Sequence, residues 1–301
     1  MDTEIMVSII CNAYNHEKYI RDALESFVMQ KTNFKFEVLV HDDASTDATA
    51  DIIKEYEVKY PELIKPIYQT ENQFSQGVHV SKKIQYPRVK GKYIALCEGD
   101  DYWIKPYKLQ KQFDFMESHS ECTLVCHNSK KINCETGETS IESPFEKQGV
   151  VSAEEIILGK KNSWVATASL FLRKELLCEK PDFHLLSPVG DYSTRLHCLA
   201  HGDIYYMDEV MSVYNFKIPG SWSSGAWRKH TKKRNVDAVE FLIKYNEYTE
   251  YRFDRFVKEA IKNRKFSDSL AAGNLKVAKS EEMKELFKTL SKKEKLRAYI
   301  M

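Results

Sequence analysis

Residues 93–103 read YIALCEGDDYW, an apolar run followed by three carboxylates around one glycine. The run Tyr93 to Cys97 predicts a buried β-strand, because it is short, apolar and bounded by a polar turn. Glu98, Asp100 and Asp101 follow at the carboxyl end of this strand, where open α/β sheets bind their ligands. Three negative charges so close together are costly without a cation, and Mg²⁺ or Mn²⁺ prefers oxygen ligands. The stretch therefore predicts a site for a divalent metal and a nucleotide diphosphate.

Strands and helices alternate on both sides of this stretch, which indicates an α/β fold with a mostly parallel central sheet and flanking helices. Before it, we expect strands at 6–11, 36–40 and 66–68 and helices at 17–29 and 48–60. Ser45 or Thr46 would cap the helix 48–60. After it, the pattern predicts helices at 109–119, 156–158 and 192–200, strands at 123–127 and 168–172, and an irregular connection at 133–149.

The charge is divided unevenly along the chain. Residues 226–301 hold 20 Lys and Arg against 11 Asp and Glu, whereas residues 1–225 hold 25 against 33. The formal net charge of +1 therefore hides an acidic part and a basic part. Helical periodicity continues beyond residue 226, and the small residues Ser221, Ser223, Ser224 and Gly225 mark the break. We expect a catalytic domain over 1–225 and a basic helical C-terminal region over 226–301.

Composition limits the class of protein. With 301 residues, 43% hydrophobic and 30% charged, the chain is long and apolar enough for a folded core. Its seven cysteines are odd in number and scattered, which favours reduced thiols over a disulfide framework. Cys122, Cys126, His127 and Cys134 are too irregularly spaced for a typical zinc site. An acidic N-terminus and the lack of long apolar runs predict a cytoplasmic protein without signal peptide or membrane span.

Other nucleotide-site motifs are missing from the sequence. Neither GxGxxG nor GxxxxGK[ST] occurs, which argues against Rossmann and P-loop sites, and neither GxSxG nor HExxH is present. A second acidic pair, Asp42 and Asp43, ends the predicted strand 36–40. This pair is either a turn or helix cap, or part of the same ligand site. The second alternative is open because both predicted strands end at one edge of the sheet.

Three blocks resemble the leading blocks of family 2 glycosyltransferases, which have the GT-A fold. They are VSIICNAYNHEKYIRDALESFVMQ at 7–30, FEVLVHDDASTDATADII at 36–53 and KGKYIALCEGDDYWIKPYKLQKQ at 90–112. They occur in the family's order and spacing; the likeness weakens after residue 130 and is absent after 226. The resemblance implies a metal-dependent inverting enzyme of the bacterial surface-polysaccharide type. It would move a sugar from a nucleotide-sugar, UDP-linked, to a saccharide or lipid-linked saccharide hydroxyl by single displacement.

The resemblance also assigns roles to residues. Asp101 and Asp100 would hold Mn²⁺ or Mg²⁺, with Glu98 at the leading acidic position of the motif. Asp43 would accept the uracil imide hydrogen, and the base would lie on Tyr14. The predicted donor-binding set is Ala13, Tyr14, Asn15, Asp42, Asp43, Asn72, Asp100 and Lys217. For Trp103, packing in the core is favoured over contact with the sugar.

Downstream of these blocks, the resemblance places the general base at Asp191. An Asp after a Gly at a helix start is also a good N-cap, so both readings stay open. The segment Val213 to Ser221 resembles the loop that closes over the diphosphate, and Lys217 falls near the position where the family often has His. Lys217 would either neutralise the diphosphate or remain solvated.

The sequence argues against two other functions. A sugar-phosphate nucleotidyltransferase usually has a glycine-rich loop after its first strand, and Asn12 to His16 contains no glycine. A degenerate domain that only binds nucleotide-sugars or acts as a scaffold is disfavoured by the intact acidic sets. The basic C-terminal region is either a solvated helical bundle or a peripheral contact with the inner face of the plasma membrane. The basic residues in question are Arg228, Lys229, Lys232, Lys233, Arg234, Lys292, Lys293, Lys295 and Arg297.

Overall fold

The structure is a computed structural model that describes residues 4–159, 164–219, 221–224, 231–291 and 295, with backbone alone for 222 and 231–236. The chain divides into two compact units. Unit 1 comprises 1–151, 161–180 and 197–226, and unit 2 comprises 152–160, 181–196 and 227–301. Two short segments from before residue 225 thus group with the C-terminal region. The reason lies in packing, because α4 (Ala153–Leu158) contacts α8 (Asp254–Ala271).

Unit 1 is built on a ten-stranded sheet of order β3-β2-β1-β4-β9-β6-β10-β5, with β7 paired to β6 and β8 to β10. The strands are β1 (Ile5–Ala13), β2 (Lys35–Asp42), β3 (Ile64–Tyr68), β4 (Tyr93–Leu96), β5 (Tyr102–Trp103), β6 (Cys122–Asn133), β7 (Thr139–Glu142), β8 (Gly149–Val150), β9 (Phe171–Arg173) and β10 (Asp203–Phe216).

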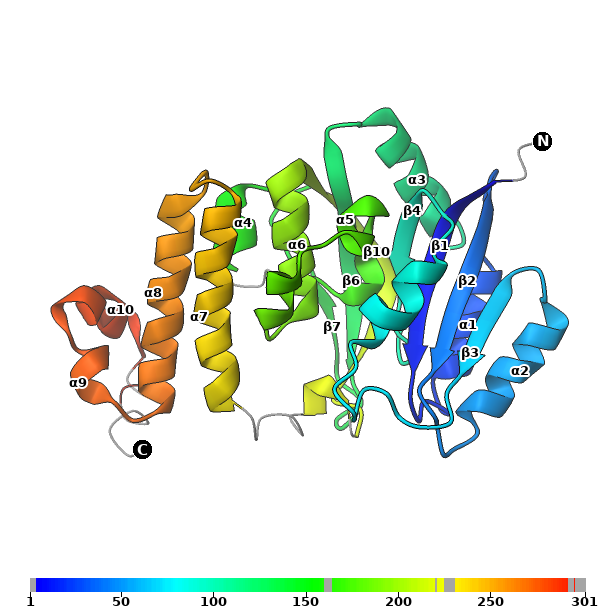
Figure 1. Cartoon of the computed structure of the whole chain (residues 1–301), viewed down its shortest axis with the longest axis horizontal. Helices are drawn as coiled ribbons and strands as arrows, with labels where there is room; N and C mark the ends of the chain where they lie inside the picture. Colours follow the sequence, from blue (N-terminus) through cyan, green and yellow to red (C-terminus); the bar gives the residue numbers. More distant parts are fainter. Residues whose placement is uncertain (1–3, 160–163, 220, 225–230, 292–294, 296–301) are drawn as a thin grey trace. The chain divides into compact units, whose positions relative to one another are not determined.

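Most of the sheet is parallel. β3, β2, β1 and β4 pair in parallel, as do β6 and β10, and β9 lies antiparallel between the two sets. The strands that run the opposite way are only two to four residues long. Figure 1 shows β1, β2 and β3 side by side in blue and cyan. The carboxyl ends of β1, β2 and β4 therefore lie at one edge of the sheet.

Helices cover this sheet with apolar faces. α1 (Ile20–Val28) buries Ile20, Ala23, Leu24 and Phe27, each with no exposed surface. Burying each of the three larger side chains contributes roughly 1.5–3 kcal/mol. The other helical elements of unit 1 are α2 (Thr49–Lys59), the π-helical η1 (Ser81–Gln85), η2 (Tyr86–Arg88), α3 (Lys108–Ser118), η3 (Thr167–Ser169), α5 (Glu175–Cys178) and η5 (Trp222–Ser224). α6 (Gly190–His201) begins in unit 2 and ends in unit 1.

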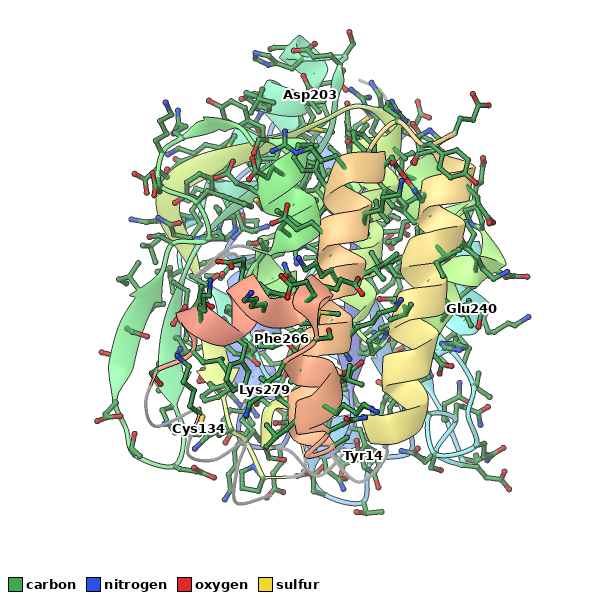
Figure 2. All side chains as sticks on the ribbon, turned by 90° about the vertical axis from the view of Figure 1, so that its left-hand side faces the viewer. Tyr14, Cys134, Asp203, Glu240, Phe266 and Lys279 are labelled. Carbon is green, nitrogen blue, oxygen red and sulfur yellow. The ribbon has the colours of Figure 1, made fainter. Side chains whose placement is uncertain are left out.

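Unit 2 is helical. Its two long helices, α7 (Thr231–Tyr248) and α8, lie side by side in Figure 1. α9 (Leu275–Ala278), η7 (Glu281–Met283) and α10 (Lys284–Thr289) follow, and η4 (Asp182–Leu186) packs on α7. Figure 2 shows Phe266 of α8 where the α9–α10 segment crosses it, and Phe266, Ala278 and Met283 form a small core there.

The structure confirms the predicted strand–helix alternation and the helices beyond 226. Four local predictions are wrong. The strand predicted at 168–172 begins only at Phe171, because Thr167–Ser169 form the 3-10 turn η3. Residues 133–149 hold β7 and β8, because this connection folds back onto β6 and β10. The capping residue of α2 is neither Ser45 nor Thr46; Asp47 Oδ1 accepts the Thr49 N–H at 2.9 Å instead. Val213–Phe216 belong to β10, so only the residues after Phe216 form a loop.

Two chain-wide expectations concern thiols and membranes. All seven cysteines are free thiols, and five of them are buried. Within the described residues, no helix is both long and apolar enough to cross a bilayer. Most of the basic residues named for membrane contact, including Arg228, Lys229, Lys292 and Arg297, lie outside the described residues.

Candidate active site

The acidic loop, residues 98–101, is held at the carboxyl end of β1. The Cys97 N–H donates to Ile10 O at 3.1 Å and the Gly99 N–H to Asn12 O at 2.9 Å, so the β1–β4 pairing continues past the end of β4. In return, the Asn12 N–H donates to Glu98 Oε2 at 3.2 Å. Glu98 is therefore occupied in holding the loop to β1. Figure 2 shows Tyr14, which follows β1, and Cys134, which follows β6, at the end of the sheet opposite Asp203.

Gly99 lets this loop approach β1 and α1 closely. A Cβ at this position would lie 3.0 Å from Ala13 Cβ, His16 Nδ1 and Ile20 Cδ1. Contacts this short force each neighbour to move by a few tenths of an ångström. The single glycine among the three carboxylates is thus required by close packing at a position with an ordinary negative φ.

Asp100 faces a histidine that the sequence reasoning missed. His16 Nε2 lies 3.9 Å from Asp100 Oδ2, and His16 Nδ1 is buried without a hydrogen-bond partner. Burial raises the pKa of the Asp100 carboxyl above its ordinary value, while positive charge on His16 opposes that rise. The site therefore holds a carboxylate whose negative charge is incompletely compensated. His16 lies within the YNHEKY run at 14–19. The loop sets the direction of its side chain, and no spacing of residues in the sequence indicates that direction.

Asp101 is held by β10, another strand of the same sheet. Its side chain is 3% exposed, and Oδ1 accepts the N–H of Asn215 in β10 at 2.9 Å. The side-chain amide of Asn215 also donates to Asp100 O at 2.7 Å. Asn215 was not predicted, because it lies 114 positions after Asp101 in the sequence and no motif connects the two residues. The acidic loop is therefore hydrogen-bonded to both β10 and β1.

Asp43 organises a neighbouring loop. Its N–H donates to Ala13 O at 2.9 Å, while Oδ1 and Oδ2 accept the N–H groups of Gln73 at 2.8 Å and Phe74 at 3.0 Å. Asn72 Nδ2 donates to Asp43 O at 3.0 Å. Asp43 and Asn72, predicted to share a pocket, are therefore in direct contact. A carboxylate has about four acceptor positions, so Asp43 retains capacity for a further donor.

Asp42 has the role of a turn residue. It is 2% exposed, and Oδ2 accepts the Ser45 N–H at 3.3 Å. Ala44, two residues after Asp42, has φ of +61°, an uncommon conformation for alanine. The turn reading of the acidic pair thus describes Asp42, whereas Asp43 reaches the adjacent loop.

The loop after β1 presents an aromatic ring to solvent. Tyr14 is 44% exposed, whereas Ala13 before it is buried. Asn15 has φ of +55°, and its side-chain oxygen accepts the Thr46 N–H at 2.8 Å while its own N–H donates to Ser45 Oγ at 2.9 Å. Asn15 therefore ties this loop to the one after β2. Both residues are exposed, but the Asn15 side chain is hydrogen-bonded to the loop after β2.

The two downstream predictions lie on different elements. Asp191 is in the first turn of α6, within unit 2, and the helix begins one residue earlier at Gly190. Lys217 directly follows β10 in unit 1 with φ of +64°, and its Nζ lies 2.7 Å from Glu135 Oε2. Hydrogen bonds therefore link the predicted residues that follow β1 and β2, whereas Lys217 pairs with Glu135 and Asp191 belongs to the other unit.

Beneath the acidic loop lies a buried lysine. Lys108 has no exposed surface, its Nζ donates to Gln112 Oε1 at 2.8 Å, and it sits 3.9 Å from the centre of the Trp103 ring. Burial lowers the pKa of Lys108 to about 7. Trp103 is 1% exposed and donates through Nε1 to Ala168 O, so the core-packing interpretation of this tryptophan is confirmed.

The residues present suit a divalent cation that shares its shell with phosphates. Within the part of the chain that is described, no three His, Cys, Asp or Glu side chains gather as a complete metal site. Mg²⁺, however, is typically held by one or two carboxylates, with water and substrate phosphates completing its shell. Asp100 and Asp101 provide such a pair in the loop that follows β4. The donor set therefore fits a metal that arrives with a diphosphate.

Comparison with known families decides the assignment. A sequence model of Glycosyl transferase family 2 matches residues 8–179, more than half of the chain. The chain belongs to this family. The match covers the three blocks that carried the resemblance except Val7, and it spans β1 from Ser8 through β9, including the acidic loop. The family 2 assignment is consistent with the sheet described above and its site at the carboxyl ends of β1, β2 and β4.

Relatives from bacteria share this region. Rv1520 of Mycobacterium tuberculosis is 35% identical over 218 residues, which are 72% of this chain and 61% of the relative. The chain thus spans about three fifths of the length of the mycobacterial relatives. The putative teichuronic acid biosynthesis glycosyltransferase TuaG of Bacillus subtilis is 28% identical over 269 residues, covering 86% of this chain and 97% of TuaG.

Solved structures of low sequence identity show the same GT-A fold. TarS residues 1–349 of S. aureus, in complex with UDP-GlcNAc, matches with a TM-score of 0.64 and 21% identity, covering 93% of this chain and 78% of that one. The mannosyltransferase PcManGT of Pyrobaculum calidifontis, in complex with GDP-Man and Mn²⁺, matches with a TM-score of 0.55 and 14% identity. It covers 99% of this chain and 86% of PcManGT.

Proposed function

We propose that this protein is a metal-dependent, inverting glycosyltransferase. It transfers a hexose-type sugar from a nucleotide-sugar donor, UDP-linked, to a hydroxyl of a saccharide or lipid-linked saccharide in one displacement. The observation that carries this proposal is the convergence of Asp43, Asp100 and Asp101 at one edge of the sheet, beside the exposed ring of Tyr14.

The residues of unit 1 would bind the donor. The face of Tyr14 offers a stacking surface for a nucleotide base, and Asp43 lies beside it, with Ala13 O accepting the Asp43 N–H. Asp100 and Asp101 would hold Mn²⁺ or Mg²⁺ against the diphosphate. When bound, this cation supplies Lewis-acid stabilisation of the departing diphosphate. Lys217, now paired with Glu135, would add positive charge near the leaving group if that exposed pair opens.

Asp191 would act as the general base. Inversion in a single step requires a carboxylate that takes the proton from the acceptor hydroxyl while its oxygen attacks the anomeric carbon. The carboxylate of Asp191 takes up that proton, and the bond between the anomeric carbon and the diphosphate oxygen breaks. This role rests on the resemblance and on the place of Asp191 at the start of α6.

The comparisons support the choice of donor and acceptor. A structural neighbour binds UDP-GlcNAc, and TuaG is named for teichuronic acid biosynthesis, which supports a UDP-sugar donor and a surface-polysaccharide acceptor. PcManGT is in complex with GDP-Man and Mn²⁺, so GDP-sugars are tested as donors beside UDP-sugars. We further propose a cytoplasmic enzyme whose basic C-terminal region contacts the inner face of the membrane. If the amount of protein that co-sediments with vesicles does not depend on salt concentration or on anionic lipid, that contact is contradicted.

A thermal-shift screen with Mn²⁺ and UDP-, GDP-, dTDP- and CMP-sugars tests the proposed function. A donor stabilises the protein by mass action, by about 2.7 kcal/mol at 100 times its dissociation constant. The expected result is stabilisation by a UDP-sugar, followed by transfer of that sugar to a saccharide acceptor. Stabilisation without transfer or hydrolysis of any donor would favour the binding-module alternative.

A further inference from the structure

Asn215 holds two consecutive residues of the acidic loop through two different donors. Its backbone N–H reaches Asp101 Oδ1 at 2.9 Å, and its side-chain Nδ2 reaches Asp100 O at 2.7 Å. Asn215 is 8% exposed; its backbone bond to Asp101 is buried and its side-chain bond to Asp100 is partly buried. Because backbone and side chain of one residue are both used, a shift of β10 at this point would move Asp100 and Asp101 together.

The orientation of this amide is set by its surroundings. Asn215 Oδ1 lies 3.9 Å from the Cys134 thiol, a weak donor, while the NH₂ group faces a carbonyl oxygen that can only accept. The backbone on either side is also fixed, since the Cys134 N–H donates to Phe216 O at 2.9 Å. The amide therefore presents its donor side to the acidic loop.

An uncharged donor suits a metal-binding loop. An arginine or lysine in this place would neutralise the carboxylates and compete with a cation, whereas an amide fixes their position and leaves their charge intact. Gly99 and Asn12 provide the second anchor on the opposite side, where Gly99 N–H donates to Asn12 O. The loop is thus held from β1 and from β10, two strands that are not neighbours in the sheet.

We infer that the Asn215 side chain is a positioning residue that sets the affinity of the acidic loop for a divalent cation. This inference rests on the proposed function, because it assumes that Asp100 and Asp101 hold the cation. Its consequence is specific: loss of the side-chain donor weakens cation binding, and excess cation restores nucleotide binding. A general loss of folded structure would not be restored in that way.

The test is calorimetric titration of UDP at a series of Mn²⁺ concentrations into the wild-type protein and Asn215→Ala. The variant keeps the backbone N–H to Asp101 and loses the side-chain bond to Asp100 O together with the weak contact from the Cys134 thiol. Because such a bond is worth roughly a factor of ten in an equilibrium constant, half-maximal UDP binding should need about tenfold more Mn²⁺. UDP affinity at saturating Mn²⁺ should match the wild type. Asn133→Ala is the matched control, since Asn133 ends the neighbouring strand β6 and its side-chain oxygen accepts the Glu135 N–H away from the acidic loop.

The outcomes separate the inference from the proposed function. If wild-type UDP binding does not depend on Mn²⁺, the metal-dependent function fails before Asn215 is considered. If wild-type binding depends on Mn²⁺ and Asn215→Ala shows the same Mn²⁺ requirement, the inference is overturned and the function stands. A loss that saturating Mn²⁺ does not restore also overturns it. If Asn215→Ala is unstable, Asn215→Thr replaces it in the same titration. Threonine favours a strand, and its side chain is too short to donate to Asp100 O.

Discussion

Replacing Lys108 by Met should change the stability of the protein in a pH-dependent way. Lys108 is fully buried on α3, and its pKa falls from an ordinary value of 10.5 to about 7. At about 1.4 kcal/mol per pKa unit, the burial of this charge costs roughly 5 kcal/mol where the amine is protonated. The ring of Trp103 lies 3.9 Å from Nζ and favours the charged form. The pKa of about 7 sets the net penalty at roughly 5 kcal/mol.

The sign of this penalty follows from proton binding. Between pH 7 and 10.5 the unfolded chain carries the lysine proton and the folded chain has released it, so wild-type stability rises with pH through that window. Below pH 7 the penalty is fully present. Met removes the charge but leaves Gln112 Oε1 without its donor, at roughly 1–2 kcal/mol. Lys108→Met should therefore gain about 3–4 kcal/mol at pH 6 and lose up to about 1 kcal/mol near pH 10.

Urea unfolding followed by far-UV circular dichroism at both pH values measures this change. The control is Lys111→Met on the same helix, because Lys111 is exposed and pairs only with Glu209, so its effect should stay within about 0.5 kcal/mol at either pH. A Lys108→Met effect that is equal at pH 6 and pH 10 would refute the buried-charge reasoning.

Four further predictions concern the site. Gly99→Ala should lower the free energy of unfolding by about 1–3 kcal/mol and weaken UDP binding, because its Cβ would press on Ala13, His16 and Ile20; urea unfolding and UDP titration measure both effects, and an unchanged variant would contradict the close packing. Ala44→Gly should gain about 1 kcal/mol by relieving a φ of +61°, whereas Ala50→Gly inside α2 should lose a similar amount in the same melts. Tyr14→Ala should weaken UDP binding by roughly 1–3 kcal/mol through lost stacking, as calorimetry would show, and Tyr14→Phe should not. Asp191→Asn should lower the transfer rate at least about a hundredfold in a steady-state assay and leave UDP affinity unchanged; a variant with a substantial fraction of wild-type rate would exclude Asp191 as the base.

The sequence predicts the acidic loop well and its supports poorly. The run before Glu98 is apolar, short and followed by charge, so local pattern places β4 and the site at its end. β10 has 14 residues and was missed, because Asp208 and Glu209 interrupt its apolar pattern where the pairing with β6 shifts register. Local periodicity contains no information about such a shift.

The residues that orient the site were missed for a related reason. His16 faces Asp100 and Asn215 holds the loop only because strands distant in sequence become neighbours in the sheet. Each looks ordinary within its own stretch, one in a polar turn and one near a strand end. The three blocks, in contrast, are local sequence features, and they identify the family and the residues that bear charge.

Calorimetric titration of UDP into the wild-type protein and Asp101→Ala, each with and without Mn²⁺, tests the central claim most directly. The claim is that the acidic loop at the end of β4 holds a nucleotide diphosphate through a divalent cation. We predict that Mn²⁺ tightens UDP binding to the wild type by at least about tenfold, or 1.4 kcal/mol, and that Asp101→Ala loses this gain while it stays folded. Equal UDP affinity with and without Mn²⁺ in the wild type, or an unchanged Mn²⁺ effect in Asp101→Ala, would contradict the claim.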